Sequence, residues 1–281
     1  NQSLSIIDSH RNLLSDQQAS AFSAEVRAIR ALFYYYAMDM FGRIPIVTSY
    51  NVNLGQVVQN ERSEVFRFIF NELQAVAPLL ADEHSNIRGD YYGRVTRPVA
   101  NFLLAKLALN AEVYTIDNWT SGSRQNGKNI FFHVNGEKKN AWETCIWYCE
   151  QLRQEGYELE NDYASNFAVH NESSKENIFT IPLDKNLYPN EYHYLFRSRH
   201  YQHGGAYGGA SENGTCATIS TVKAYGYATD HVDNRFYTNF YADTIFVDGK
   251  KVYLDNGEPL VYRPLELKLN LSASPYKQTA G

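Results

Sequence analysis

The sequence predicts a mainly α fold, in which stacked helix pairs are followed by an irregular, loop-rich part with short β-hairpins. In the first half of the chain apolar residues recur every three to four positions, which is the spacing of one helix face. In the second half this spacing is lost, and apolar residues alternate only in a short stretch near the end. The expected helices cover residues 24–40, 63–80, 96–114 and 141–154.

The starts of these four segments lie roughly 35 to 45 residues apart, near the period of tetratricopeptide repeats. Amphipathic helices at this spacing favour helix-turn-helix units stacked against each other, although no repeat consensus is legible. With 281 residues, the chain is long enough to bury a substantial core in this way.

Local signals mark where the helices begin and end. Gly42 can take the left-handed conformation after the first helix, and Pro45 blocks its continuation. Ser63 is a good N-cap for the second helix. Thr96 opens the third, with Pro98 in its first turn. Because the third segment is apolar nearly all round, we expect it to be buried.

The second half is expected to contain few regular elements. Residues 177–181 read as a short strand. Residues 243–262 alternate around Asp248-Gly249 and Asn256-Gly257, two strong tight-turn signals. A small β meander is therefore expected there.

No Pro- or Ser-rich linker separates the halves, which favours one domain over residues 1–281. Within it we expect a helical, repeat-like body at 1–160 and a loop-rich part with the β meander at 161–281. The chain begins at Asn1 rather than Met, and no targeting segment follows, which favours a processed or trimmed chain.

Charge and hydropathy argue against two classes of partner. The net charge of −5 makes nucleic acid unfavourable, because phosphate binding needs clustered Lys and Arg. No apolar run approaches the roughly 18 to 20 residues needed to cross a bilayer.

The sequence contains no catalytic constellation, so we do not expect an enzyme. A Gly-x-Ser-x-Gly elbow is absent. Glu172 and Glu176 are close together, but such pairs are common on solvated loops and do not by themselves make a glycosidase. The run GGAYGG at 204–209 lacks the Lys and Ser/Thr of a phosphate loop.

No cofactor is expected either. Three neighbouring residues carry oxygen ligands that would suit Ca²⁺: Asp230, Asp233 and Asn234. Their spacing does not match a calcium-binding loop, so we expect them to cap turns. A structural Ca²⁺ is the alternative. Three histidines are expected to be polar loop residues rather than transition-metal ligands: His193, His200 and His203.

Residues 190–209, NEYHYLFRSRHYQHGGAYGG, concentrate Tyr, His, Arg and Gly and contain almost no aliphatic side chain. Each Tyr offers a flat apolar face and a hydroxyl, which suits the C–H faces and hydroxyls of sugars. Glycines let the backbone approach a ligand and bend sharply. The same composition suits a peptide ligand or a lid packed on the helices, so the residues alone leave these alternatives open.

Four stretches, in order along the chain, resemble segments of the SusD/RagB family of nutrient-binding surface lipoproteins of Bacteroidetes. AEVRAIRALFYYYAMDMFGRIPIV at 24–47 resembles the family's signature helix. GRVTRPVANFLLAKLALNAEVY at 93–114 is similar to its next core helix. NDYASNFAVHNESSKENIFTIP at 161–182 and DNRFYTNFY at 233–241 are similar to two later elements.

The resemblance implies a non-enzymatic glycan receptor built on tetratricopeptide-like helix pairs. Such proteins are held outside the outer membrane by an N-terminal lipid, absent from this chain, and pass oligo- or polysaccharide to a SusC-like TonB-dependent transporter. RagB-type relatives imply an oligopeptide or glycopeptide receptor instead, and a helical scaffold that only seats the transporter is a third alternative. Family members are usually much longer, so the resemblance implies an internal fragment.

In this family the segment after the 161–182 element commonly contributes ring-stacking residues, which implies a ligand site at 187–207. The ligand-binding residues expected there are Tyr188, Tyr192, Tyr194, Arg197, Tyr201, His203 and Tyr207. Loops in the first half add three further candidates: Tyr91, Tyr92 and Trp119.

Polar and aromatic residues of the helices are expected to serve the scaffold. Arg27 and Arg30 interrupt apolar neighbours, and we expect them to pair with carboxylates or backbone carbonyls. The aromatic residues expected to pack between helices are Tyr34, Tyr35, Tyr36, Trp142 and Trp147.

Overall fold

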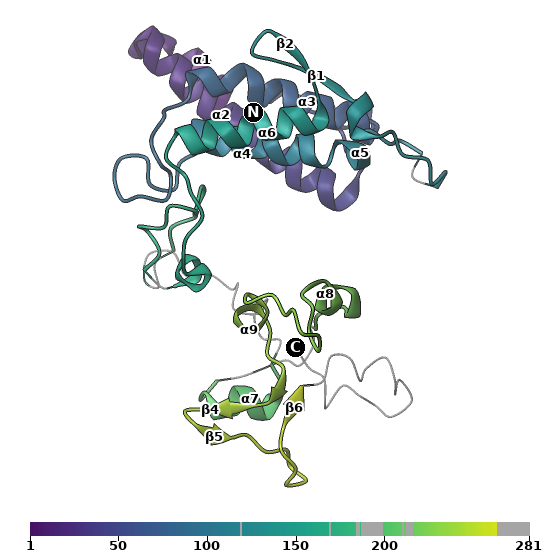
Figure 1. Ribbon diagram of the computed structural model, residues 1–281. Coiled ribbons are helices and arrows are strands. Elements are labelled where there is room, and N and C mark those ends of the chain that lie inside the picture. Colours follow the sequence, from purple (N-terminus) through teal and green to yellow (C-terminus); the bar gives the residue numbers. More distant parts are fainter. Residues whose placement is uncertain are drawn as a thin grey trace. The chain divides into compact units, whose positions relative to one another are not determined.

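The computed structural model describes residues 1–118, 120–168, 170–183, 186, 199–209, 211 and 216–262. The chain divides into two compact units, Asn1–Pro182 and Leu183–Gly281. The first, called here the helical unit, contains the long helices, and the second, called the small unit, contains short helices and strands (Figure 1). The mainly α fold expected from the sequence is confirmed.

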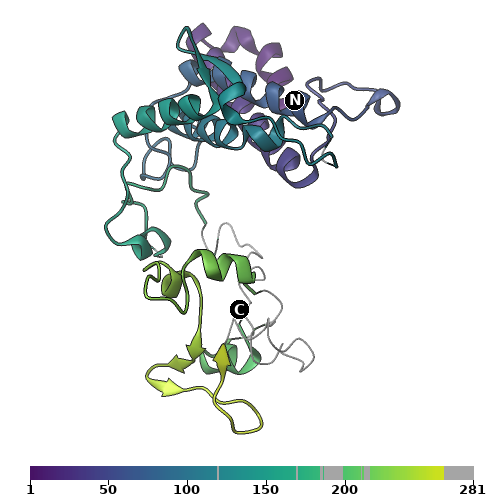
Figure 2. The ribbon, with the colours of Figure 1, turned by 45° about the vertical axis from the view of Figure 1, so that its right-hand side comes forward.

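Successive helices of the helical unit pack side by side. Its described α-helices are α1 Gln2–Ser9, α2 Asp16–Phe41, α3 Arg62–Val76, α4 Arg97–Leu109, α5 Ala111–Tyr114 and α6 Ala141–Gln154. Short 3₁₀ turns lie at Arg11–Leu13, Leu54–Gln56, Ala77–Leu79, Gly127–Asn129 and Tyr163–Phe167. α2 packs on α3, α3 on α4, and α4 on α6 (Figure 2).

The four helices expected from the sequence are all present, and the differences lie at their ends. α2 begins two turns earlier than its apolar pattern, because Ser15 caps it. The Ser15 hydroxyl accepts from the Gln18 amide, and the Gln18 side chain accepts from the Ser15 amide. α2 ends as expected before Gly42, which has a φ of 71° and donates its amide to the Met38 carbonyl.

The start of α3 differs from the expected cap. Glu61 occupies the N-cap position, and Ser63 lies in the first turn. The Ser63 amide and hydroxyl donate to the Asp117 carboxylate at 3.0 and 2.8 Å, so Asp117 holds the loop after α5 against this helix start. The third expected helix is interrupted at Asn110, which gives α4 and α5.

The core of the helical unit is formed mainly by α2, α3, α4 and α6. α4 is buried on most of its circumference, as its composition predicts. The Phe70 ring of α3 stacks on Phe132 with centroids 4.4 Å apart, and Phe66 meets the same ring edge-on. These contacts attach the β-hairpin to the helices.

The β-hairpin between α5 and α6 was not predicted from the sequence. Strands β1 Phe131–Val134 and β2 Glu137–Asn140 pair antiparallel, with Val134 opposite Glu137. Asn135 and Gly136 connect them with φ values of 52° and 76°, the left-handed pair of a type I′ turn. The Asn-Gly dipeptide is the sequence signal that could have identified it.

The small unit contains the expected β meander. Its described elements are α7 Tyr201–Ala206, α8 Ile219–Ala224, α9 Phe236–Asn239, β3 Asp243–Thr244, β4 Phe246–Val247, β5 Lys250–Lys251 and β6 Val261–Tyr262. β4 pairs with β5 across Asp248-Gly249, and β3 pairs with β6. Tyr253 and Pro259 bridge across the second predicted turn.

The prediction of a strand at 177–181 is wrong. The segment is irregular, and the residues at its start are bonded locally. The Ser174 hydroxyl accepts from the amides of Glu176 and Asn177. The Asn177 amide group donates to the Asn166 carbonyl. Ile178 and Phe179 still pack against the helical core.

Among the described residues, no helix combines the length and apolar character needed to cross a membrane. Within the same residues, no three His, Cys, Asp or Glu side chains gather closely enough to hold a metal ion. The Asp233 carboxylate, considered above as an oxygen ligand, accepts from the Arg235 guanidinium at 2.6 to 3.2 Å.

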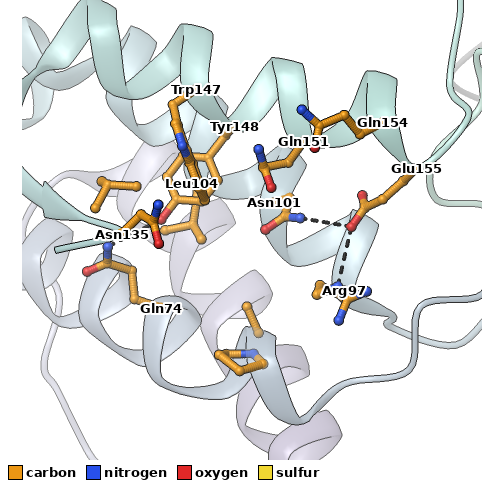
Figure 3. Close-up of a pocket in the computed structure, with 13 residues that line it drawn as sticks. Gln74, Arg97, Asn101, Leu104, Asn135, Trp147, Tyr148, Gln151, Gln154 and Glu155 are labelled. Carbon is orange, nitrogen blue, oxygen red and sulfur yellow. Dashed lines mark hydrogen bonds and ion pairs between the residues drawn. The ribbon is translucent and has the colours of Figure 1, made fainter. Parts of the chain in front are cut away.

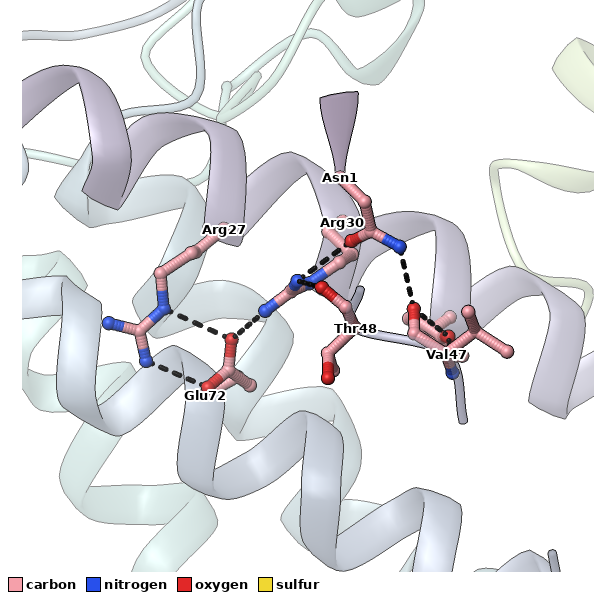
Figure 4. Close-up of polar contacts among 7 residues, drawn as sticks. Asn1, Arg27, Arg30, Val47, Thr48 and Glu72 are labelled. Carbon is pink, nitrogen blue, oxygen red and sulfur yellow. Dashed lines mark hydrogen bonds and ion pairs between the residues drawn. The ribbon is translucent and has the colours of Figure 1, made fainter. Parts of the chain in front are cut away.

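A shared carboxylate joins α2 to α3. Glu72 accepts from Arg27 at 2.7 and 3.1 Å and from Arg30 at 2.8 Å (Figure 4). Arg30 also donates to the Asn1 side chain, which in turn donates to the Val47 carbonyl. The expectation that Arg27 and Arg30 pair with carboxylates is confirmed, and their network also fixes the segment after α2.

We expect Glu72→Gln to lower the free energy of unfolding by about 2 kcal/mol, because two guanidinium groups lose their counter-charge in a partly dry site. The side chains of Glu72 and Arg30 are only 17% and 14% exposed. Urea unfolding followed by circular dichroism measures the change. The control is Glu150→Gln, whose partner Arg153 is exposed, and which should cost under about 0.5 kcal/mol. Equal losses in both variants would contradict the prediction.

The same carboxylate predicts an acid dependence of stability. Burial raises the pKa of Glu72, but the hydrogen bonds from Arg27 and Arg30 outweigh burial and hold the pKa below its ordinary value. The unfolded chain therefore binds this proton more readily, and the contribution of Glu72 is lost as pH falls through the folded-state pKa. The stability gap between the native chain and Glu72→Gln should narrow between neutral pH and about pH 4. Urea titrations at both pH values test this, and an unchanged gap would refute it.

Candidate ligand-binding site

The small unit contains a compact group of aromatic and cationic side chains, called here the tyrosine–arginine cluster: Arg199, His203, Tyr207, Tyr241 and Tyr262. The guanidinium carbon of Arg199 lies 5.0 Å from the centre of the Tyr207 ring and 5.6 Å from that of Tyr241. Both distances are within the range of cation–π attraction. One cation thus holds two rings from distant parts of the chain.

His203 is the buried centre of this cluster. It is fully buried, and its ring centre lies 4.5 Å from that of Tyr241, nearly edge-on. Its Nδ1 is 3.0 Å from the Tyr262 hydroxyl, which also accepts the His200 amide at 2.8 Å. Burial lowers the pKa of His203 to about 4, and the charges of Arg199 and His200 act in the same direction. The imidazole is therefore neutral near pH 7, and its Nδ1 can accept from the Tyr262 hydroxyl.

Helix α7 is placed by close packing and by one polar contact. A Cβ at Gly204 would lie 2.0 Å from the Ser211 hydroxyl oxygen, so only glycine lets these segments approach so closely. Gln202 donates to Asp255 at 2.6 Å, which ties α7 to the meander. Tyr207 follows the helix directly. The position of its ring is therefore set by a short, well-anchored helix.

The outer rings of the cluster face solvent. Tyr207 is 52% exposed and Tyr241 is 42% exposed, whereas Tyr262 behind them is buried. Partial burial raises the pKa of Tyr207, with Tyr241 contributing in the same direction, so the phenol is neutral near pH 7. The cluster thus presents two half-exposed rings with their hydroxyls, each approached on one side by the Arg199 guanidinium. This is a surface on which a flat polyol can stack and hydrogen-bond.

The residues expected from the sequence fall into three groups. Tyr207 lies in the cluster, and Tyr201 is 59% exposed on α7, with its ring near His200. His203 lies behind the exposed rings, because its imidazole packs against three tyrosines, and in this position it supports them instead of reaching solvent. The remaining candidates outside the described residues are Tyr188, Tyr192, Tyr194, Arg197 and Trp119.

Tyr91 and Tyr92 belong to the helical unit and are half-buried. The Arg94 guanidinium lies 4.7 Å from the Tyr91 ring centre and pairs with Glu25 at 2.6 Å. One face of Tyr91 is therefore already covered by a cation of the chain itself. A ligand therefore cannot stack on that face of Tyr91 unless Arg94 moves away.

Three cluster residues were not among the candidates: Arg199, Tyr241 and Tyr262, the last residue of β6. Arg199 lies between the predicted Arg197 and Tyr201, and its proximity to both rings follows from the fold of this segment. Tyr241 is the last residue of the 233–241 element, which was recognised as a family element but not as part of a site. Its position before β3 is what brings it to α7.

The helical unit has a separate hollow of about 510 Å³ between α3, α4, α6 and the hairpin turn (Figure 3). Trp147, expected to pack, is half-buried and forms part of its wall. Amide side chains, a carboxylate and an arginine make up much of the remainder. The hollow was not predicted from the sequence, because its wall is assembled from separate segments of the chain: α3, α4, the hairpin turn and α6.

No family model matches the chain. It is 31% identical over 171 residues to the starch-binding protein SusD of Bacteroides thetaiotaomicron, a match that covers 56% of this chain. The matched part is 29% of the length of SusD, so the chain corresponds to less than a third of that relative.

Solved structures share the fold at lower identity. A SusD-like protein from Bacteroides fragilis superposes with a TM-score of 0.53 at 19% identity, over 75% of this chain and 36% of that one. A crystal structure with xylogluco-oligosaccharide superposes with a TM-score of 0.58 at 19% identity, over 80% of this chain and 42% of that one. The sequence match to SusD and the shared fold support the expected membership of the SusD-like family.

Proposed function

We propose that the chain is part of a non-enzymatic glycan-binding protein of the cell surface that delivers its ligand to a SusC-like TonB-dependent transporter. In this proposal the protein is anchored in the outer membrane by a lipid outside the present chain and needs no cofactor. The tyrosine–arginine cluster of the small unit contributes stacking and hydrogen-bonding groups to the glycan site.

The observation that carries the proposal is the pair of half-exposed rings, Tyr207 and Tyr241, held by Arg199 between them. Because His203 and Tyr262 fix the rings from behind, little side-chain entropy remains to be lost when a ligand stacks on them. Neutral phenols and one guanidinium supply the hydrogen-bond donors and acceptors that a hydroxyl-rich ligand needs.

The comparisons supply the ligand class. SusD of Bacteroides thetaiotaomicron is a starch-binding protein, and one protein of similar fold was crystallised with a xylogluco-oligosaccharide. Both ligands are chains of neutral sugars. A site with a few stacking rings should bind such ligands with micromolar to millimolar affinity, which suits a receptor that must release its cargo.

We expect Tyr207→Ala and Tyr241→Ala each to weaken oligosaccharide binding about tenfold, because each removes one stacking face. Isothermal titration calorimetry of the 281-residue chain with maltooligosaccharides and xylogluco-oligosaccharides measures the change. Tyr253→Ala is the matched control, since Tyr253 is 51% exposed in the same unit but lies outside the cluster. The oligosaccharide affinity of Tyr253→Ala should equal that of the native chain.

Two other results would replace the proposal. Binding of oligopeptides but of no oligosaccharide would assign the protein to the RagB-type peptide receptors. Unchanged oligosaccharide affinity in both cluster variants, together with weaker capture of a SusC-like transporter, would make the cluster a seat for the transporter.

A further inference from the structure

The hollow in the helical unit carries a second inference, because one face of α6 is lined with groups that bind polyols. Trp147, Gln151 and Gln154 follow one another at intervals of four and three residues, so they share one face of the helix. In the described part of the chain neither glutamine side chain forms a hydrogen bond. Both amides are therefore available to a ligand, beside an indole ring.

The opposite wall is more rigid. The Gln74 amide of α3 donates to the His133 carbonyl at 2.9 Å and to the Tyr148 hydroxyl at 3.2 Å. The Asn101 amide of α4 donates to Glu155 at 3.2 Å. These bonds fix the amide nitrogens and so determine where the amide oxygens stand. Asn135, at the hairpin turn, completes the rim (Figure 3).

Glu155 closes one end of the hollow. One of its carboxylate oxygens accepts from Arg97 at 3.3 Å and from Asn101, while the other is buried without a partner among the described residues. A buried acceptor without a partner is unfavourable, and a hydroxyl from a ligand would relieve it. Arg97 also pairs with Asp82 at 2.5 Å, so two carboxylates share one guanidinium and the end of the hollow disfavours an anionic ligand.

From this arrangement we infer that the hollow is a carbohydrate subsite for a single sugar ring, separate from the tyrosine–arginine cluster. The ring would lie between Trp147 and Glu155, bond the amides of Gln151 and Gln154 through vicinal hydroxyls, and donate one hydroxyl to Glu155. An amide offers one acceptor and two donors, so it can serve hydroxyls in either role. The volume of about 510 Å³ lies within the range of small-molecule pockets.

The ligand class of this subsite, carbohydrate, rests on the proposed function. The choice of its residues does not. The cluster and the hollow lie in different units, so each can be disabled without touching the other. Failure of one site in an experiment therefore does not imply failure of the other.

The test uses the whole chain labelled with 5-fluorotryptophan. Its three tryptophans give three ¹⁹F resonances, and the Trp147→Phe variant identifies that of Trp147. D-Glucose, D-galactose, D-mannose, D-xylose and N-acetyl-D-glucosamine are titrated separately. We expect at least one sugar to shift the Trp147 resonance in a saturable manner. The Gln151→Ala/Gln154→Ala variant should raise the dissociation constant about tenfold, because two hydrogen bonds are lost.

Two control variants test whether a change in the Trp147 titration comes from the hollow itself. Gln17→Ala, an exposed glutamine on α2, should leave the titration unchanged. Tyr207→Ala/Tyr241→Ala should also leave it unchanged, even if oligosaccharide binding at the cluster proves absent. The inference is overturned if no sugar shifts Trp147, if the double glutamine variant titrates like the native chain, or if triglycine shifts Trp147 and the sugars do not.

Discussion

Buried polar side chains must find partners, and this constraint decides which groups of the chain face solvent. In the helical unit Glu72 meets it by accepting from Arg27 and Arg30 together, which joins α2 to α3. Arg30 extends the network through Asn1 to the segment after α2. Ion pairing of this kind supports a helix-stacked scaffold in which charged residues can lie close to the core.

The same constraint arranges the tyrosine–arginine cluster. The Tyr262 hydroxyl is buried and is bonded by the His200 amide and by His203. Tyr207 and Tyr241 pack on these inner groups and stay half-exposed, while Nε2 of His203 is buried without a hydrogen-bond partner among the described residues. The half-exposed rings of the cluster thus rest on buried side chains. In the hollow of the helical unit the constraint is incompletely met, because one oxygen of Glu155 has no partner among the described residues.

Much of the helical unit could be predicted from the sequence. α6 has the predicted bounds, because its apolar period and its Asn140 cap are local properties of the chain. The start of α2 was missed because the Ser15 capping box precedes the apolar pattern. The strand expected at 177–181 failed because strand formation needs a partner, which no local pattern supplies.

By itself the sequence determined the mainly α fold, the order of the long helices, the meander and the resemblance to the SusD-like family, since these follow from local periodicity, turn residues and similarity along the chain. It also pointed to Tyr207 through composition. Only the tertiary structure decided that Tyr241 joins Tyr207 through Arg199, that His203 is a buried support, and that Trp147 lines a hollow. The physical reason is that a binding surface depends on which side chains meet from distant segments and which are buried beneath them, and local sequence patterns contain neither.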